Sequence, residues 1–240
     1  MKLFYDFHIH SALSPCAEND MTPSNIINMS IINELDVIAL TDHNCSKNCK
    51  TLMNLGREND ILVIAGMELT TQEEVHMVML FKELYSAEKF SEFVQSRIMK
   101  VPNRPEIFGD QLIMDEKDNI IGVQENWLVP ATDISIDKAY DLAKEYDAAI
   151  FPAHINRASH SIISNLGVFP DQPDFSCVEV SKTADVNSLI KSYPLLSKKL
   201  ILHDSDAHRL EDMLLDFHSI EVEEKNEKSV IDAINRGLGL

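Results

Sequence analysis

Short apolar runs alternate with amphipathic stretches along the chain, and this alternation limits the folds open to it. Several runs are rich in β-branched residues, as in strands buried on both faces. They are "KLFYDFHI", "DVIALT", "ILVIAG", "VHMVMLF", "AAIFPA", "SCVEV", "KLILH" and "FHSIEV". Strand–helix alternation favours an α/β fold with a largely parallel sheet. About seven such units fit a barrel-like closure better than a small open sheet.

Several of the intervening stretches carry helix signals. Thr22 and Pro23 suit the cap and first position of one helix. Residues 135–148 are amphipathic, and "EKSVIDAINRGLG" predicts a closing helix that ends at Gly237.

Residues 98–131 break this rhythm, with three prolines, two glycines and the acidic turn "DEKDN". Within them, "QLIMDEKDNIIGV" predicts a hairpin of two short strands. We expect a single domain over residues 1–240, with this region as an insertion that forms a lid over the mouth of the site.

Composition narrows the class of protein. The chain has 240 residues and is 45% hydrophobic, which suits one compact domain. It has no long apolar segment and no signal peptide, so we expect a cytoplasmic protein without membrane contact. Its four cysteines, Cys16, Cys45, Cys49 and Cys177, are too scattered for a disulfide framework.

The formal net charge of −18 repels polyanions, so we expect no binding of long nucleic acid. Bound divalent ions would make a pocket locally positive. A small anionic substrate therefore remains compatible with the acidic composition.

Side chains that can bind metals recur where the apolar runs end. Such positions gather at one rim of a barrel or open α/β sheet. A core histidine explains any single case but not the whole set, which includes six of the nine histidines: His8, His10, His43, Glu68, His76, His154, Asp206 and His208. Imidazoles and carboxylates suit zinc, manganese or iron. The sequence contains no P-loop, no dinucleotide-binding glycine motif and no G-x-S-x-G elbow.

Five motifs in this order resemble those of the PHP (polymerase and histidinol phosphatase) family: "DFHIHS", "IALTDHN", "GMELTT", "PAHINR" and "SDAH". They span residues 6 to 208. The resemblance implies a distorted (β/α)7 barrel with two or three divalent ions at its carboxyl rim. It also implies phosphoester hydrolysis in many members.

The resemblance implies ligands for each ion. The first would be bound by His8, His10, Glu68 and Asp206. Glu68 would bridge to a second ion at His76 and His154. His43 and His208 would bind a third, where Cys16 stands in place of the usual histidine or aspartate. Cys16 either binds this ion as a thiolate, faces the site without binding, or packs as a small apolar residue.

Other residues beside these motifs have two interpretations each. Asp6 and Asp42 either orient neighbouring histidines or cap turns. Arg157 and Arg209 either bind a substrate phosphate or form surface salt bridges.

The leading hypothesis is a phosphoesterase for a small phosphorylated metabolite or nucleotide, acting through a metal-bound hydroxide. His43, Asp206 and His208 are its candidate catalytic residues, with His208 available for proton transfer if the third ion is absent. The alternatives are an exonuclease or nucleotide phosphatase on short oligonucleotides, and a non-catalytic metal-binding regulatory module.

Overall fold

The computed structural model describes residues 1–213 and 218–238. Its centre is a curled six-stranded sheet with the strand order β10-β1-β2-β3-β4-β7. These strands are β1 (Lys2–Ile9), β2 (Val37–Leu40), β3 (Leu62–Thr70), β4 (His76–Phe81), β7 (Ala148–Pro152) and β10 (Ser219–Glu221). A separate parallel pair, β8 (Cys177–Ser181) and β9 (Leu200–Asp204), lies beside β7 and β1.

The predicted α/β class is confirmed, but the described strands do not form a regular ring of parallel strands. Strands β1, β2 and β3 are parallel, whereas β4 is antiparallel to both β3 and β7. Strand β9 forms no described ladder with β1, and the segment after it is bound to β1's end at the rim, where His10 N donates to Ala207 O at 3.0 Å. The edge strand β10 is also antiparallel to its neighbour β1, so the sheet is a curled half-barrel with two reversed strands, β4 and β10.

Strand periodicity divides the apolar residues between two faces. Val37 and Ala39 face the barrel interior with Phe7, whereas Ile38 and Leu40 pack toward the outer helices. Both faces are covered, which explains why the run "VIAL" is apolar at every position.

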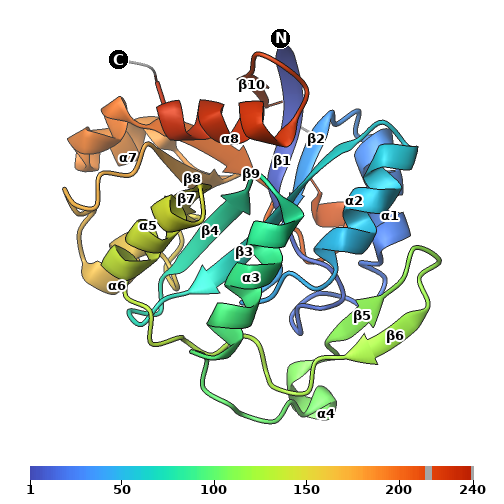
Figure 1. Ribbon diagram of the computed structural model, residues 1–240. Helices are drawn as coiled ribbons and strands as arrows, with labels where there is room; N and C mark the ends of the chain where they lie inside the picture. Colours follow the sequence, from blue (N-terminus) through green and yellow to red (C-terminus); the bar gives the residue numbers. More distant parts are fainter. Residues whose placement is uncertain (214–217, 239–240) are drawn as a thin grey trace.

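Helices cover the outer side of the sheet and one end of the barrel (Figure 1). The main helices are α1 (Pro23–Ile32), α2 (Cys49–Glu58), α3 (Leu84–Gln95), α5 (Ile136–Glu145) and α8 (Glu227–Arg236). Shorter ones are α4 (Pro105–Phe108), α6 (Ile162–Leu166) and α7 (Val186–Ser192). The predicted helix boundaries are confirmed at Thr22, whose Oγ1 accepts a hydrogen bond from Asn25 N, and at Gly237, which follows α8. None of the described helices is long and apolar enough to cross a membrane.

The insertion contains the predicted hairpin, formed by β5 (Leu112–Met114) and β6 (Ile120–Val123). Figure 1 shows it beside α1 and α2, on the opposite side of the molecule from α8. The Asn48 amide binds one edge of β5 at its first and last residues: Nδ2 donates to Leu112 O at 3.0 Å, and Oδ1 accepts from Met114 N at 3.1 Å. The hairpin is therefore fastened to the barrel, and the lid over the mouth of the site stays a prediction.

Candidate metal centre

The strand ends bring the ligand-type side chains to one rim. His8 lies in β1 and His10 just after it, while His43, His154 and Asp206 follow β2, β7 and β9. Glu68 is two residues from the end of β3. The reversed direction of β4 places its first residue, His76, at this same rim. Thus the predicted residues meet, although one comes from the start of a strand.

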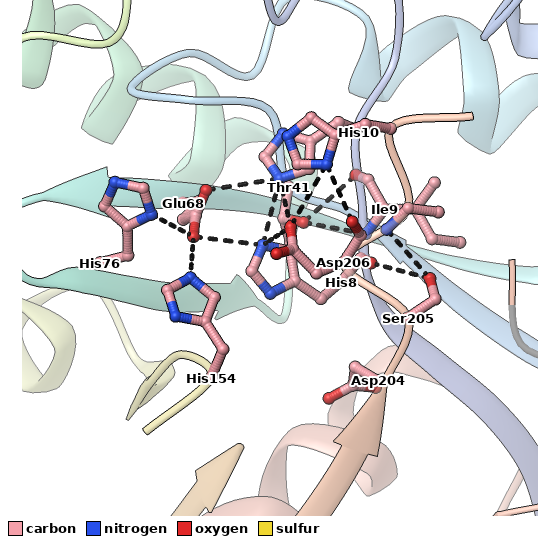
Figure 2. Close-up of polar contacts among 12 residues, drawn as sticks. His8, Ile9, His10, Thr41, Glu68, His76, His154, Asp204, Ser205 and Asp206 are labelled. Carbon is pink, nitrogen blue, oxygen red and sulfur yellow. Dashed lines mark hydrogen bonds and ion pairs between the residues drawn. The ribbon is translucent and has the colours of Figure 1, made fainter. Parts of the chain in front are cut away.

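Glu68 is the hub of the cluster, and Figure 2 shows it between His76 and His154 on one side and the β1 histidines on the other. Its Oε1 lies 2.8 Å from His76 Nδ1 and 3.3 Å from Nε2 of both His8 and His154. Its Oε2 lies 2.9 Å from His43 Nδ1 and 3.4 Å from His10 Nε2. One carboxylate therefore contacts five imidazoles.

Asp206 forms a second, smaller hub. Its Oδ1 lies 3.3 Å from His8 Nε2 and 3.2 Å from His10 Nε2. Its Oδ2 contacts Arg157 Nη1 at 2.5 Å. Asp206 and His154 both have left-handed backbones, with φ of 50° and 32°, as residues at functional sites sometimes do.

Three overlapping groups of side chains offer ligand atoms within 4.8 Å of one another. They are His8, His10, Glu68 and Asp206; His43, Glu68 and His76; and His10, His43 and His208. The first group is the set expected for the first ion. In the second group His43 stands with Glu68 and His76, where the family resemblance implied His154.

The donor set fits divalent ions. Glu68 Oε2 and His43 Nδ1 are buried and only 2.9 Å apart, yet neither has a hydrogen bond of acceptable geometry among the described residues. A cation between such atoms would satisfy both. Nitrogen and carboxylate ligands together suit zinc, manganese or iron.

Electrostatics hold two of the ligands, Glu68 and His76, in metal-binding protonation states. Burial raises the pKa of Glu68, but His76, His8 and His43 outweigh burial and hold that pKa well below its usual range. Burial lowers the pKa of His76 to about 4 despite the opposing effect of Glu68. Near neutral pH, Glu68 is therefore ionised and His76 is a neutral imidazole, as metal ligation requires.

Behind the cluster, the fully buried Glu179 of β8 contacts His8. Its Oε2 lies 2.7 Å from His8 Nδ1. Sequence reasoning missed this residue. The signal available in the sequence was the glutamate in the apolar run "CVEV". If this run is a buried strand, its glutamate lies in the interior of the protein.

Asp42 supports His10 through a serine. Ser14 Oγ donates to Asp42 Oδ1 at 2.7 Å and lies 2.9 Å from His10 Nδ1. Asp42 therefore orients a histidine indirectly, in agreement with one of its two interpretations. Asp6 instead accepts from the backbone, at Ser205 N and His8 N.

A pocket of about 240 Å³ opens over the cluster. Its lining comprises Cys16, His43, Glu68, His76, Val129, His154, Arg157, Ser159, His160, Asp206 and His208. His160 was not predicted for the site. Its ring stacks on that of His76, with centroids 4.7 Å apart.

The two arginines, Arg157 and Arg209, have different surroundings in the structure. Arg157 lines the pocket, but Arg209 does not and instead forms salt bridges with Glu18 and Glu211 at the surface. These salt bridges agree with the second interpretation of Arg209, and its role in phosphate binding stays a prediction.

Cys16 lies exposed at the pocket, so it does not pack as an apolar core residue. Partial desolvation by the surrounding residues raises the pKa of the Cys16 thiol. His43 and His208 lower this pKa by a larger amount, so that it is about 5. Cys16 is thus a thiolate beside the third group of ligands.

Comparisons with known proteins support this description. The family model for the PHP domain matches residues 6–180. No curated protein matches the chain. Among solved structures, the lesion-specific endonuclease PfuEndoQ from Pyrococcus furiosus is similar with a TM-score of 0.69 and 19% identity, covering 98% of this chain and 56% of that one.

A protein from Bifidobacterium adolescentis, provisionally named a metal-dependent phosphoesterase, is similar with a TM-score of 0.64 and 14% identity over 98% of this chain and 96% of that one. An endonuclease Q complex with a 27-mer duplex, whose abasic lesion lies at the active site, is similar with a TM-score of 0.67 and 18% identity. That match covers 98% of this chain and 56% of the endonuclease. The chain thus spans just over half the length of the endonucleases.

The expectation that an acidic net charge excludes long nucleic acid is wrong. A chain of similar fold holds a DNA duplex at its active site. Net charge sums the whole surface, whereas the potential at one pocket depends on nearby groups and bound cations.

Proposed function

The chain belongs to the PHP domain family, and on this premise we propose that it is a metal-dependent hydrolase of phosphate esters. The observation that carries the proposal is the contact of one buried carboxylate, Glu68, with five imidazoles beneath an open pocket. Burying so many polar ligand atoms together destabilises the fold unless cations pair with them.

Each group of ligand atoms has a proposed place in binding the ions. The first ion would be held by His8, His10, Glu68 and Asp206, and the second by Glu68 and His76 with His43 or His154. A third would lie near His10, His43 and His208, within reach of Cys16. When bound, such ions stabilise charge on a phosphoryl group and activate water.

Other side chains at the pocket would act on the substrate directly. Arg157 presents a guanidinium at the mouth, and it would bind a phosphate oxygen. His208 Nδ1 donates to the carbonyl of Asp206 at 2.8 Å. This leaves Nε2 to bind the third ion when the ring is neutral, or to contact a phosphate oxygen and give a proton to the leaving oxygen when the ring is an imidazolium.

The leading substrate class is a small phosphorylated metabolite or nucleotide, since the pocket of about 240 Å³ suits a phosphoryl group with part of its leaving group. A second candidate is a nuclease activity on short or long nucleic acid. The specific observation that favours it is the similarity of fold to the duplex-bound endonuclease.

A substrate panel with the purified chain tests both. It would contain a small phosphomonoester, a nucleoside monophosphate, a short single-stranded oligonucleotide and a duplex with an abasic site, each with manganese or zinc and with chelator. Metal-dependent phosphate release that is lost in Glu68→Gln would support the proposal. Tight metal binding without turnover of any substrate would instead indicate the regulatory module.

A further inference from the structure

Glu179 occupies the middle of β8, between two buried valines, with none of its surface exposed. A carboxylate in such a position is destabilising unless its oxygens are fully used. Fold stability alone therefore does not account for a glutamate here.

The two oxygens of Glu179 contact two different ligand residues. Oε2 lies 2.7 Å from Nδ1 of His8, and Oε1 accepts from the backbone N–H of His154 at 3.0 Å. His8 and His154 in turn contact the same oxygen of Glu68, each at 3.3 Å. One buried carboxylate thus holds two neighbouring ligands from behind.

These contacts determine which atom of His8 faces the centre. A carboxylate oxygen accepts hydrogen bonds, so this contact favours a His8 with its proton on Nδ1. Its Nε2 is directed toward Glu68 and Asp206. For His154 the carboxylate holds the backbone, which is left-handed with a φ of 32° and needs such support.

We propose that Glu179 is a positioning residue that presents His8 Nε2 and the His154 loop to the metal centre together, and so sets its metal affinity. The inference rests on the proposed metal centre. It concerns a residue that touches neither the pocket nor, by this geometry, an ion.

Glu179→Gln is a sharp test because glutamine has one accepting and one donating end. Glu179 serves two N–H donors, and the isosteric amide can serve only one. If its oxygen stays with His154, the amide N–H faces His8 Nδ1 and favours the proton on Nε2, where it blocks ligation. If the amide turns around, the N–H of His154 loses its acceptor. Either arrangement weakens metal binding while preserving volume.

The measurement is zinc affinity by competition with a chelator, for the wild type, Glu179→Gln and the exposed control Glu83→Gln. We expect affinity to fall by about 10- to 100-fold in Glu179→Gln and to stay unchanged in the control. Proton–nitrogen correlation NMR of the zinc-loaded wild type should show a proton bound to His8 Nδ1. Its proton resonance should lie far downfield, and the proton should exchange slowly with water.

Equal zinc affinity in the wild type and Glu179→Gln would overturn the inference. So would a His8 that carries no Nδ1 proton in the zinc-loaded wild type, a result that does not depend on the variant folding. Failure of the wild type itself to bind zinc or manganese would count against the proposed function instead, and the two failures are thereby distinguished.

Discussion

Oε1 of Glu68 lies 2.8 Å from Nδ1 of His76, and this contact joins the antiparallel strands β3 and β4 at the rim. Glutamine at position 68 keeps the shape but loses the charge and one accepting oxygen. We expect Glu68→Gln to lose at least one ion per chain and to lower turnover by about 100-fold or more. Metal analysis and phosphate release measure both. Glu74→Gln, an exposed change in the next loop, is the control, and unchanged stoichiometry with unchanged turnover would refute the bridging role.

Arg157 and Arg209 form a matched pair for testing phosphate binding. Arg157 lines the pocket and pairs there with Asp206, whereas Arg209 pairs with acidic side chains outside it. We expect Arg157→Ala to raise KM by about tenfold, the value of one charge-assisted contact. Arg209→Ala should leave KM unchanged. Steady-state kinetics on one phosphate ester would show it, and equal KM values for the two variants would argue against phosphate binding at Arg157.

Cys16 is predicted to react as a thiolate. Because its pKa is about 5, the alkylation rate in metal-free protein should be nearly constant above about pH 6, unlike that of an ordinary thiol. The buried Cys45, Cys49 and Cys177 serve as internal controls, identified by mass spectrometry. Zinc should slow the reaction if Cys16 is a ligand. Equal rates with and without zinc would exclude ligation.

Asn48 should be more important for stability than its surface neighbour Asn54. Its side chain donates to Ser11 Oγ and satisfies two backbone groups of β5. We expect Asn48→Ala to lower the free energy of unfolding by about 2–3 kcal/mol, because buried backbone groups lose their partners. Asn54→Ala removes two exposed contacts, with Glu116 and Arg57, and should cost under about 0.5 kcal/mol. Denaturant unfolding measures both, and similar values would contradict a fastened insertion.

Replacement of residues 98–131 by a short linker should destabilise the protein and not only change its specificity. Leu112 and Met114 pack against Ala12, and Leu128 packs against Leu13 and Cys45. Their removal would expose this apolar surface. A lower melting temperature is the expected result. An unchanged one, with altered substrate preference, would support the lid interpretation.

The rim was predictable because it follows from local patterns. An apolar run shows where a strand ends, and parallel strands bring their ends together, so His8, His43 and Asp206 could be placed side by side. The reversal of β4 did not affect the prediction for His76, because a residue at the start of an antiparallel strand reaches the same rim.

Contacts between distant segments could not be predicted in this way. Glu179 and His8 are 171 residues apart, and a lone glutamate in "CVEV" does not reveal its partner. The same holds for Arg209, whose position after "SDAH" resembles that of a site residue until its salt bridges are seen. Polar side chains that bind remote backbone, such as Asn48, leave no periodic pattern.

The anchoring of the hairpin also bears on how chimeras of this chain would have to be built. Asn44 Nδ2 donates to Leu128 O, and the Asn48 amide binds β5. The side chains that anchor the insertion therefore lie some fifty residues or more upstream of it. If only residues 98–131 were replaced by a segment from another protein, Asn44 and Asn48 would be placed to bind a backbone that the new segment does not have. The transferable module is contiguous in space but discontinuous along the chain, and recombination at a single pair of crossover points would divide it.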